Sequence, residues 1–487
     1  MSMIKIEDLT FSYPTSYDNI FECANFQMDT SWRLGLVGRN GRGKTTLLNL
    51  LMGKYRYSGK IICSVQFDYF PFLVTEPSDM TAQVLEKICP LAQEWEFMRE
   101  LSYLEVDNEV LWRPFETLSK GEQTKILLAA LFLKEGHFLL IDEPTNHLDG
   151  KARELVSSYL KRKKGFLLVS HDRGFLDGCV DHIVSLNRAD IQVQSGNFSS
   201  WMENFNRQQE FELAQNERLQ KDISRLQQAA RQSSVWSDKV EASKKGAADK
   251  GYVGHKAAKM MKRSKGIEAR RNQAIRKKSE LLKNVETTEK LKMMPLMYHT
   301  DTFVSFLQVA ACYQEKMASH PVSFQIRQGQ RIALEGKNGS GKSSLLKLLV
   351  RENISHTGTI HVGSGLIVSY VPQDTSNLRG TLSDFAEENH LDESLFKAVL
   401  RKMDFERIQF EKDMADFSGG QKKKVLIARS LCEQAHLYVW DEPLNFIDVY
   451  SRMQIEQLIL EFSPTMLFVE HDLMFREAVA TNSVFVG

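Results

Sequence analysis

Four short motifs occur twice in the chain, in the same order, with offsets of 298, 299, 299 and 300 residues between the copies. The pairs are 38–45 and 336–343, 118–122 and 417–421, 142–146 and 441–445, and 170–172 and 470–472. A nearly constant offset indicates an internal duplication. We therefore expect a first domain at 1–202, a linker at 203–294 and a second domain at 295–487.

The residues around these motifs predict the same local structure in both copies. An apolar segment precedes each glycine-rich loop, a helical segment follows it, and another apolar segment ends at each Asp-Glu pair. The expected strands are 34–37, 138–141 and 165–169 in the first copy and 332–334, 437–440 and 466–469 in the second, with helices at 46–52 and 344–350. This order of elements is typical of an α/β fold with a mainly parallel sheet.

Each glycine-rich loop has the composition of a triphosphate-binding loop. Glycines allow backbone N–H groups to surround phosphates, and the N-terminus of the following helix adds partial positive charge. We expect Lys44 and Lys342 to reach the β- and γ-phosphates of ATP, and Thr45 and Ser343 to ligate Mg²⁺. Two loops predict two ATP sites.

The acidic pairs supply candidate catalytic groups. Asp142 and Asp441 each follow a predicted strand and suit the outer shell of the metal, while Glu143 and Glu442 would orient or deprotonate the attacking water. The alternative for an acidic pair after a strand is a helix N-cap. Its recurrence within the repeated set of motifs favours the catalytic interpretation.

A histidine also recurs after an apolar strand in both copies. His171 and His471 are candidate sensors of the γ-phosphate. A single histidine in this setting is usually a structural residue. Its presence at matching positions favours the sensor.

Together these motifs resemble those of the ABC ATPase family. In that family the Ser-x-Gly motif of one domain contacts the γ-phosphate bound by the other, so the resemblance implies two ATP molecules buried head to tail between the domains. One site would join Lys44 and Glu143 to Ser418 and Gly420, and the other Lys342 and Glu442 to Ser119 and Gly121. The family also has an aromatic residue under adenine; Tyr13 and Tyr313 occupy that position, with burial in the core as the alternative.

The resemblance implies ATP and Mg²⁺ as ligands. The nucleotide-binding candidates are Tyr13, Gly38, Asn40, Gly41, Gly43, Lys44, Thr45, Thr46, Ser119, Gly121, Glu122, Tyr313, Gly336, Asn338, Gly339, Gly341, Lys342, Ser343, Ser344, Ser418, Gly419, Gly420 and Gln421. The metal candidates are Thr45, Asp142, Ser343, Gln373 and Asp441.

The two copies depart from the family pattern in different ways. Lys120 replaces the first glycine of the family's Ser-Gly-Gly, and Phe72 stands where the second copy has Gln373. Leu444 and Phe446 stand where the first copy has Thr145 and His147. We therefore expect the two sites to hydrolyse ATP at different rates.

The linker is a basic segment within an otherwise acidic chain. Residues 207–292 contain 22 Lys and Arg against 11 Asp and Glu, whereas the whole chain has a net charge of +1. Apolar residues recur at helical spacing in two runs: Leu219, Ile223, Leu226 and Ala230, then Met260, Ile267, Ala274 and Leu281. The pattern predicts two antiparallel helices joined by a turn at 237–256, each arm reaching roughly 50 Å at ~1.5 Å per residue.

Cations and aromatic rings alternate around the predicted turn. The candidate RNA-binding residues are Lys244, Lys245, Lys250, Tyr252, His255, Lys256, Lys259, Lys262 and Arg263. Such a mixture suits phosphate backbones and stacked bases. The alternative is a charged coiled coil that serves only as a spacer.

Composition narrows the classes of protein to which this chain can belong. No apolar run approaches the ~20 residues of a membrane-spanning helix, and the first residues predict a strand rather than a secretion signal. Six scattered cysteines without a Cys-x-x-Cys pair argue against a zinc or iron–sulfur site and favour a reducing compartment. We expect a cytoplasmic protein.

Over its whole length the chain resembles the ABC-F family of translation factors. The resemblance rests on residues 142–149, 170–173 and 196–199, and a closer likeness to Lsa-type antibiotic-resistance proteins rests on 32–44, 110–115, 261–265 and 440–445. It implies an ATPase that acts as a monomeric pseudo-dimer and binds the ribosome at the exit tRNA site. The linker would extend toward the large-subunit rRNA and the tRNA in the peptidyl site, displacing lincosamides, pleuromutilins and streptogramin A compounds.

Other functions are open at this point. A housekeeping ABC-F factor acting on stalled ribosomes is the nearest alternative, and an ATPase subunit of an exporter is another. A DNA-repair ATPase would carry its coiled coil inside one domain rather than between two. Because the segments between Phe72 and Ser119 and after His471 are short, we expect neither a large arm insertion nor a C-terminal extension.

Overall fold

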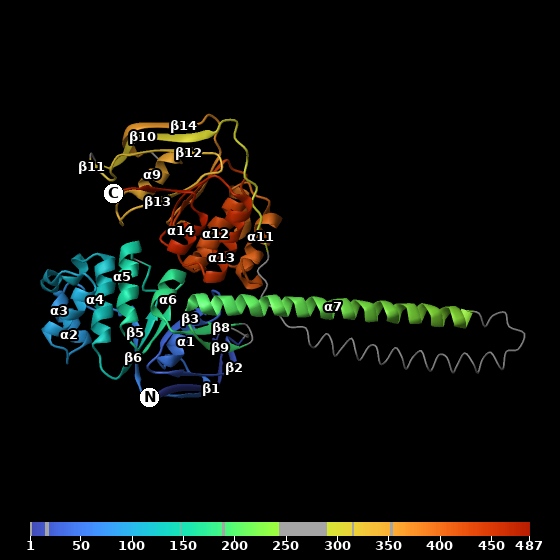
Figure 1. Ribbon diagram of the computed structural model, residues 1–487, viewed down its shortest axis with the longest axis horizontal. Coiled ribbons are helices and arrows are strands. Elements are labelled where there is room, and N and C mark those ends of the chain that lie inside the picture. The colour runs from blue at the N-terminus through green and yellow to red at the C-terminus, as the bar shows by residue number, and fades with distance from the viewer. Residues whose placement is uncertain are drawn as a thin grey trace, which may run out of the picture. The chain divides into compact units, whose positions relative to one another are not determined.

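The structure is a computed structural model that describes residues 2–14, 19–146, 148–187, 190–242, 290–313, 316–350 and 354–487 (Figure 1). The chain divides into two compact units. One unit comprises Met1–Trp201 and Thr288–Gly487, and the other comprises Met202–Thr287. We call 1–201 the first cassette and 288–487 the second cassette.

The first cassette is built on two sheets. Strands β1 (Met3–Phe11), β2 (Phe21–Asp29) and β4 (Ser58–Ile62) form an antiparallel sheet in the order β2-β1-β4. The second sheet has the order β5-β6-β7-β3-β8-β9, formed by β5 (Gln66–Phe70), β6 (His137–Asp142), β7 (Phe166–Val169), β3 (Arg33–Gly38), β8 (His182–Leu186) and β9 (Ile191–Ser195). All its pairs are parallel except β8 with β9.

Helices complete the first cassette. They are α1 (Lys44–Leu51), α2 (Thr81–Ile88), α3 (Glu94–Tyr103), α4 (Lys120–Phe132), α5 (Gly150–Lys161) and α6 (Arg173–Cys179), with 3-10 turns at Asn108–Trp112 and Phe115–Thr117. Apolar residues of both sheets and of α1 share one core, in which Leu36, Leu47 and Leu140 are fully buried. This packing fixes the glycine-rich loop between β3 and α1.

The second cassette repeats this plan. Strand β10 (Thr302–Tyr313) pairs with β11 (Lys316–Met317), β12 (Val322–Arg327) and β14 (Ser355–Val362) in one sheet. The parallel sheet has the order β15-β16-β17-β13-β18, formed by β15 (Val368–Val371), β16 (Leu437–Asp441), β17 (Met466–Val469), β13 (Arg331–Glu335) and β18 (Asn482–Phe485).

Its helices are α9 (Lys342–Leu349), α10 (Leu382–Glu388), α11 (Glu393–Lys402), α12 (Gly419–Cys432), α13 (Val449–Phe462) and α14 (Leu473–Val479), with 3-10 turns at Arg407–Glu411 and Met414–Asp416. Trp440 on β16 is fully buried, and its indole Nε1 donates to Ser430 Oγ on α12 over 2.9 Å. The expected tandem α/β fold is confirmed, and every predicted strand and helix of the two cassettes overlaps an observed one.

Strand order explains how the motifs come together. In the first cassette β3, β7 and β6 are neighbours, and in the second β13, β17 and β16 are neighbours. The carboxyl ends of parallel strands meet at one edge of a sheet. The glycine-rich loop, the acidic pair and the histidine of each copy therefore lie side by side.

The linker differs from its prediction at the first arm. Helix α7 runs from Phe198 to Ala242 without interruption, so it continues through 237–242, where we predicted a turn. Serine and aspartate cost a helix only tenths of a kcal/mol each, and this stretch contains neither Gly nor Pro. Loss of the apolar pattern therefore did not mark a helix end.

Several predictions for the linker fall outside the described residues. They include the return helix with Met260, Ile267, Ala274 and Leu281, and the RNA-binding candidates Lys244, Lys245, Lys250, Tyr252, His255, Lys256, Lys259, Lys262 and Arg263. His147 also lies outside them. Among the helices that the structure describes, none combines the length and hydropathy needed to cross a membrane.

Candidate nucleotide sites

The glycine-rich loops take the same shape in both cassettes. Gly43 and Gly341 both have φ 86°, immediately before α1 and α9, a left-handed conformation that favours glycine. A Cβ on Gly43 would lie 2.5 Å from Ile20, and one on Gly341 2.5 Å from the carbonyl oxygen of Ala318. The loop thus presents backbone N–H groups and a helix N-terminus to one region, as a phosphate requires.

The loop lysines are buried and folded back onto their own loops. Lys44 Nζ donates to Gly38 O over 2.7 Å, and Lys342 Nζ to Gly336 O over 2.8 Å. Burial lowers the pKa of both lysines. Each amine therefore lies within its loop, in position to meet phosphate oxygens.

The carboxylates at the strand ends have the donor chemistry that Mg²⁺ prefers. In the first cassette Thr45 Oγ1 lies 3.2 Å from Asp142 Oδ2, which also accepts from the Tyr69 hydroxyl over 3.0 Å. In the second, Asp441 is fully buried, and neither of its carboxylate oxygens has a hydrogen-bond partner of normal geometry in the described part of the chain. Burial raises the pKa of Asp441 to about 6, and the Ser343 hydroxyl opposes part of that rise. A buried, unpartnered carboxylate beside a hydroxyl fits a hard cation.

Each glutamate after the strand lies beside the histidine of its own cassette. The Oε1 to Nε2 distance is 3.3 Å both between Glu143 and His171 and between Glu442 and His471. Both glutamates also have left-handed backbones, with φ 49° at Glu143 and 46° at Glu442. The catalytic candidates thus occupy matching positions, with the same unusual backbone.

The hydrogen bonds of the two glutamates are unequal. Glu442 Oε2 accepts from Gln373 Nε2 over 2.9 Å and from Asn445 Nδ2 over 2.5 Å. Glu143 Oε1 has no hydrogen bond within the described residues, despite the nearby histidine. Phe72 stands where Gln373 stands in the second cassette, and it cannot donate.

This difference changes the expected charge of the two glutamates. Burial, reinforced by Asp142, raises the pKa of Glu143 to about 8. Burial also acts to raise the pKa of Glu442, but His471, Gln373 and Asn445 outweigh it and lower that pKa to about 2. These contacts favour the ionised form of Glu442, as a general base requires, whereas burial beside Asp142 favours the protonated form of Glu143.

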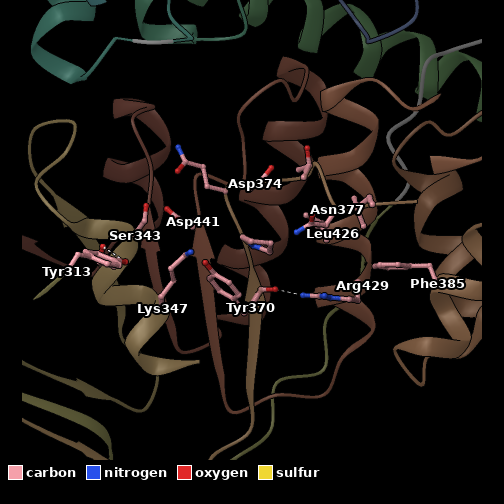
Figure 2. Close-up of a pocket in the computed structure, with 15 residues that line it drawn as sticks. Tyr313, Ser343, Lys347, Tyr370, Asp374, Asn377, Phe385, Leu426, Arg429 and Asp441 are labelled. Carbon is pink, nitrogen blue, oxygen red and sulfur yellow. Dashed lines mark hydrogen bonds between the residues drawn. The ribbon is translucent and has the colours of Figure 1, made fainter. Parts of the chain in front are cut away.

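The two tyrosines upstream of the loops make matching contacts. The Tyr13 hydroxyl lies 2.9 Å from Thr46 Oγ1, and the Tyr313 hydroxyl 3.2 Å from Ser344 Oγ. In the second cassette Tyr313, Ser343 and Asp441 line a cavity of about 600 Å³ (Figure 2). A ring held at the side of the loop is suited to stacking on a purine.

The second candidate site is assembled from both cassettes. A cavity of about 950 Å³ is lined by loop residues of the second cassette and by Ser-x-Gly residues of the first. Its lining includes Ser119, Gly121, Glu122, Asn338, Gly339, Gly341, Lys342, Ser343, Ser344, Gln373, Glu442 and His471. The four residues that the sequence paired for this site, Ser119, Gly121, Lys342 and Glu442, are all among them. Ser119 also caps α4, its Oγ accepting from Glu122 N over 3.2 Å.

The first candidate site shows direct contact between its two sides. Asn40 Nδ2 of the glycine-rich loop donates to the carbonyl oxygen of Phe446 over 2.9 Å, and Arg39 forms an ion pair with Asp404 over 3.4 Å. A Cβ on Gly420 would lie 2.9 Å from Asn40 Nδ2. Ser418 caps α12 at the same end, its Oγ accepting from Gln421 N over 3.3 Å. Asn40 of the glycine-rich loop therefore lies against the motif that contains Ser418, Gly419, Gly420 and Gln421.

Sequence reasoning missed a pair of buried arginines. Arg153 Nη1 lies 2.9 Å from Asp172 Oδ2, and Arg452 Nη1 lies 3.0 Å from Asp472 Oδ2. Their Nε atoms donate to the carbonyls of Leu148 and Ile447. Each arginine thus joins the segment before α5 or α13 to the residue after the candidate sensor histidine. Recurrence of this arginine at an offset of 299 residues was the available signal.

Comparison with known proteins identifies the recurring unit. The family described as ABC transporter matches residues 21–146 and 319–445. The ribosome protection protein VmlR of Bacillus subtilis (strain 168) is 27% identical over 98% of this chain and 85% of its own length. The energy-dependent translational throttle protein EttA of Haemophilus influenzae is 25% identical over 93% of this chain and 87% of its own length.

A solved structure supports the fold. The archaeal ribosome recycling factor aABCE1, in complex with the ribosomal stalk protein aP1, has a TM-score of 0.63 to this chain at 19% identity. The similarity covers 98% of this chain and 87% of that one. At this identity the likeness concerns the arrangement of the fold alone.

Proposed function

We propose that this chain, which belongs to the ABC transporter family and hydrolyses ATP, uses that hydrolysis to act on the ribosome as an ABC-F protein. The observation that carries the proposal is the similarity to VmlR over 98% of the chain, through both cassettes and the segment between them. EttA, named for an effect on translation, matches over a similar span. A ribosome-bound function also places the protein in the cytoplasm.

The geometry of the sites supports an ATP-dependent closure of the two cassettes. Ser119 and Lys342 line one cavity although they belong to different cassettes, so a nucleotide bound there would contact both. Binding energy is then available only when the cassettes are together, which shifts their equilibrium toward closure. Thr45 and Asp142, and Ser343, Gln373 and Asp441, would hold Mg²⁺, which neutralises phosphate charge.

Hydrolysis would then reverse the closure. Glu442, ionised and held by Gln373 and Asn445, is positioned to accept a proton from the attacking water, and His471 would contact the γ-phosphate. Loss of that phosphate removes contacts shared by the two cassettes. The net effect is a cycle of closing and opening driven by ATP.

We propose protection from large-subunit antibiotics as the specific activity. The basic linker, net positive over 207–292, would reach toward large-subunit rRNA and the tRNA in the peptidyl site, where lincosamides, pleuromutilins and streptogramin A compounds bind. The similarity to VmlR favours this activity. The similarity to EttA favours the second candidate, a housekeeping translation factor.

Ribosome pelleting and drug susceptibility test the proposal together. The variant Glu143→Gln, Glu442→Gln should bind ATP without hydrolysing it and should pellet with ribosomes at physiological salt. Failure to pellet would refute ribosome binding. Cells that express the wild type should tolerate the named drugs better than cells that express a variant lacking 244–256; equal susceptibility of wild-type and empty-vector cells would favour the housekeeping factor.

A further inference from the structure

A buried lysine in the second cassette contacts the backbone next to the candidate catalytic glutamate, Glu442. Lys423, on α12, is 1% exposed. Its Nζ donates to the carbonyl oxygen of Pro372 over 2.7 Å and to that of Asp441 over 3.2 Å. Burial of an amine is costly unless its donors are satisfied, and these two carbonyls accept two of its three donors.

The two carbonyls belong to the residues immediately before the catalytic pair. Gln373 follows Pro372, Glu442 follows Asp441, and the side chains of Gln373 and Glu442 are hydrogen-bonded over 2.9 Å. Pro372 follows the last residue of β15, and Asp441 is the last residue of β16. One side chain therefore joins the ends of two neighbouring strands at the point where each presents a functional group.

Helix α12 holds β15 at further points. Arg429 donates to the carbonyl oxygen of Tyr370, and the Ser430 hydroxyl lies 2.7 Å from that of Ser369. Strand β15 is thus attached to α12 at both Ser369 and Tyr370. Lys423 is the contact that extends this attachment beyond the strand to the residue before Gln373.

The first cassette provides an internal comparison. At the same offset of 299 residues, the position of Lys423 is occupied by Thr124, whose short side chain cannot span two carbonyls. Gln373 is replaced there by Phe72, and Glu143 Oε1 has no hydrogen bond among the described residues. The long amine and the amide partner of the glutamate occur together in one cassette, and both are missing from the other.

We propose that Lys423 is a positioning residue for hydrolysis at the second site. By holding the carbonyls of Pro372 and Asp441, it fixes the spacing of the two backbones from which Gln373 and Glu442 project. It does not touch the nucleotide site itself. Its loss would let the strand ends separate, and the glutamate would lose the orientation that its amide partner provides.

The test measures ATP turnover of the second site alone, in the Glu143→Gln background. Lys423→Met keeps the length of the side chain and removes its donors. We expect kcat to fall about tenfold to hundredfold, because small misplacement of a catalytic group has effects of this size, with KM for ATP little changed. Lys423→Gln keeps a donor on a shorter side chain, so its kcat should lie between those of the parent and of Lys423→Met.

A control separates positioning from a general effect on stability. Lys163, in the first cassette, forms an ion pair with the buried Glu100 over 2.5 Å and lies outside both sites. Lys163→Met should lower the melting temperature without changing kcat per folded molecule. If Lys423→Met loses activity only in proportion to its folded fraction, or retains the parent kcat, the proposal is overturned.

A double variant tests the route of the effect. If Lys423 acts through the Gln373–Glu442 pair, combining Lys423→Met with Gln373→Ala should cost much less than the product of the two single losses. Independent effects, in which the fold losses multiply, would overturn the proposal even if Lys423→Met alone is impaired. All variants are compared below the melting temperature of the least stable one.

Discussion

The side-chain amide of Asn40 donates to the backbone carbonyl of Phe446 over 2.9 Å, and this hydrogen bond joins the loop of one cassette to the other cassette. Phe446 has a left-handed backbone, with φ 63°. Gly420 lies against the bond: a Cβ there would be 2.4 Å from the Phe446 carbonyl oxygen and 2.9 Å from Asn40 Nδ2. A side chain at 420 would therefore crowd both the Phe446 carbonyl of its own cassette and the Asn40 amide of the other.

Substitution Gly420→Ala should therefore obstruct closure. A methyl group cannot occupy that space unless the carbonyl or the amide shifts. Under the proposed mechanism, turnover requires the two cassettes to be close. We expect steady-state ATPase activity to fall on the order of tenfold, since each 1.4 kcal/mol of lost stabilisation costs a factor of ten. The measurement is ATP hydrolysis by the purified full chain.

Gly419→Ala is the matched control. A Cβ at 419 would lie 3.4 Å from the ring of Phe446, an ordinary van der Waals contact. This variant should keep most of the activity. Equal losses from the two alanines would contradict the role assigned to Gly420.

The two catalytic glutamates should not be equivalent. Glu442→Gln removes an ionised carboxylate held by Gln373 and Asn445, whereas Glu143→Gln replaces a group whose pKa is raised to about 8. We expect Glu442→Gln to remove most of the ATPase activity and Glu143→Gln to remove much less. Indistinguishable losses, measured by phosphate release at pH 7, would show that the two sites work alike.

Phe72→Gln should make the first site resemble the second. The new amide would stand where Gln373 stands and could donate to Glu143, whose Oε1 has no hydrogen bond within the described residues. One hydrogen bond is worth about 1 kcal/mol, so turnover at the first site should rise roughly fivefold. The assay uses the Glu442→Gln background, and Phe72→Leu, which adds no donor, is the control. A gain with leucine would show that removal of the ring, and not the amide, is responsible.

Glu100 should make stability depend on pH below neutrality. It is 2% exposed and accepts from the Tyr159 hydroxyl over 2.7 Å and from Lys163 Nζ over 2.5 Å. Burial acts to raise the pKa of Glu100, but the contacts with Lys163 and Tyr159 outweigh it and the pKa is lowered. The unfolded chain then binds the proton more tightly, so stability is lost as pH falls through the lowered pKa.

Glu100→Gln tests this dependence. At pH 7 the variant should be less stable by about 1–3 kcal/mol, because Lys163 loses its charged partner. The difference should shrink as pH falls below the ordinary glutamate value of about 4.3. Thermal unfolding from pH 7 to pH 3.5 is the measurement, and Glu86→Gln, on the exposed face of α2, should parallel the wild type. If the difference in stability between wild type and Glu100→Gln stayed constant from pH 7 to pH 3.5, the role assigned to the Glu100 charge would be contradicted.

The local elements of the cassettes were predictable because their causes are local. Apolar runs such as 138–141 become buried strands, and each loop glycine marks a left-handed turn before a helix. The pairing of Ser119 with Lys342 followed from the family resemblance, and the structure brings these residues to one cavity. The inequality of the sites was also visible, since Phe72 and Gln373 differ in hydrogen-bonding capacity.

What could not be predicted depends on contacts distant in sequence. A run of three lysines at 422–424 suggests a solvated surface, yet Lys423 and Lys424 are 1% and 3% exposed. Their carbonyl and carboxylate partners come from other elements, which no local pattern reveals. The end of α7 was placed wrongly because 237–242 has no apolar pattern of helical spacing, although it also contains no Gly or Pro that would end a helix.

The left-handed backbone shared by Glu143 and Glu442 has a consequence for how these positions can vary. A non-glycine residue at such φ values stores roughly 1 kcal/mol or more of conformational strain. At Glu143, whose Oε1 has no hydrogen bond among the described residues, replacement by glycine should therefore raise the melting temperature of the protein. At Glu442 the loss of the hydrogen bonds from Gln373 and Asn445 opposes that gain. Such a glycine variant at position 143 would be more stable to heat while losing a carboxylate needed to cleave ATP. Selection for stability alone would remove the acidic side chain, so the carboxylate is kept for catalysis at a cost in thermal stability.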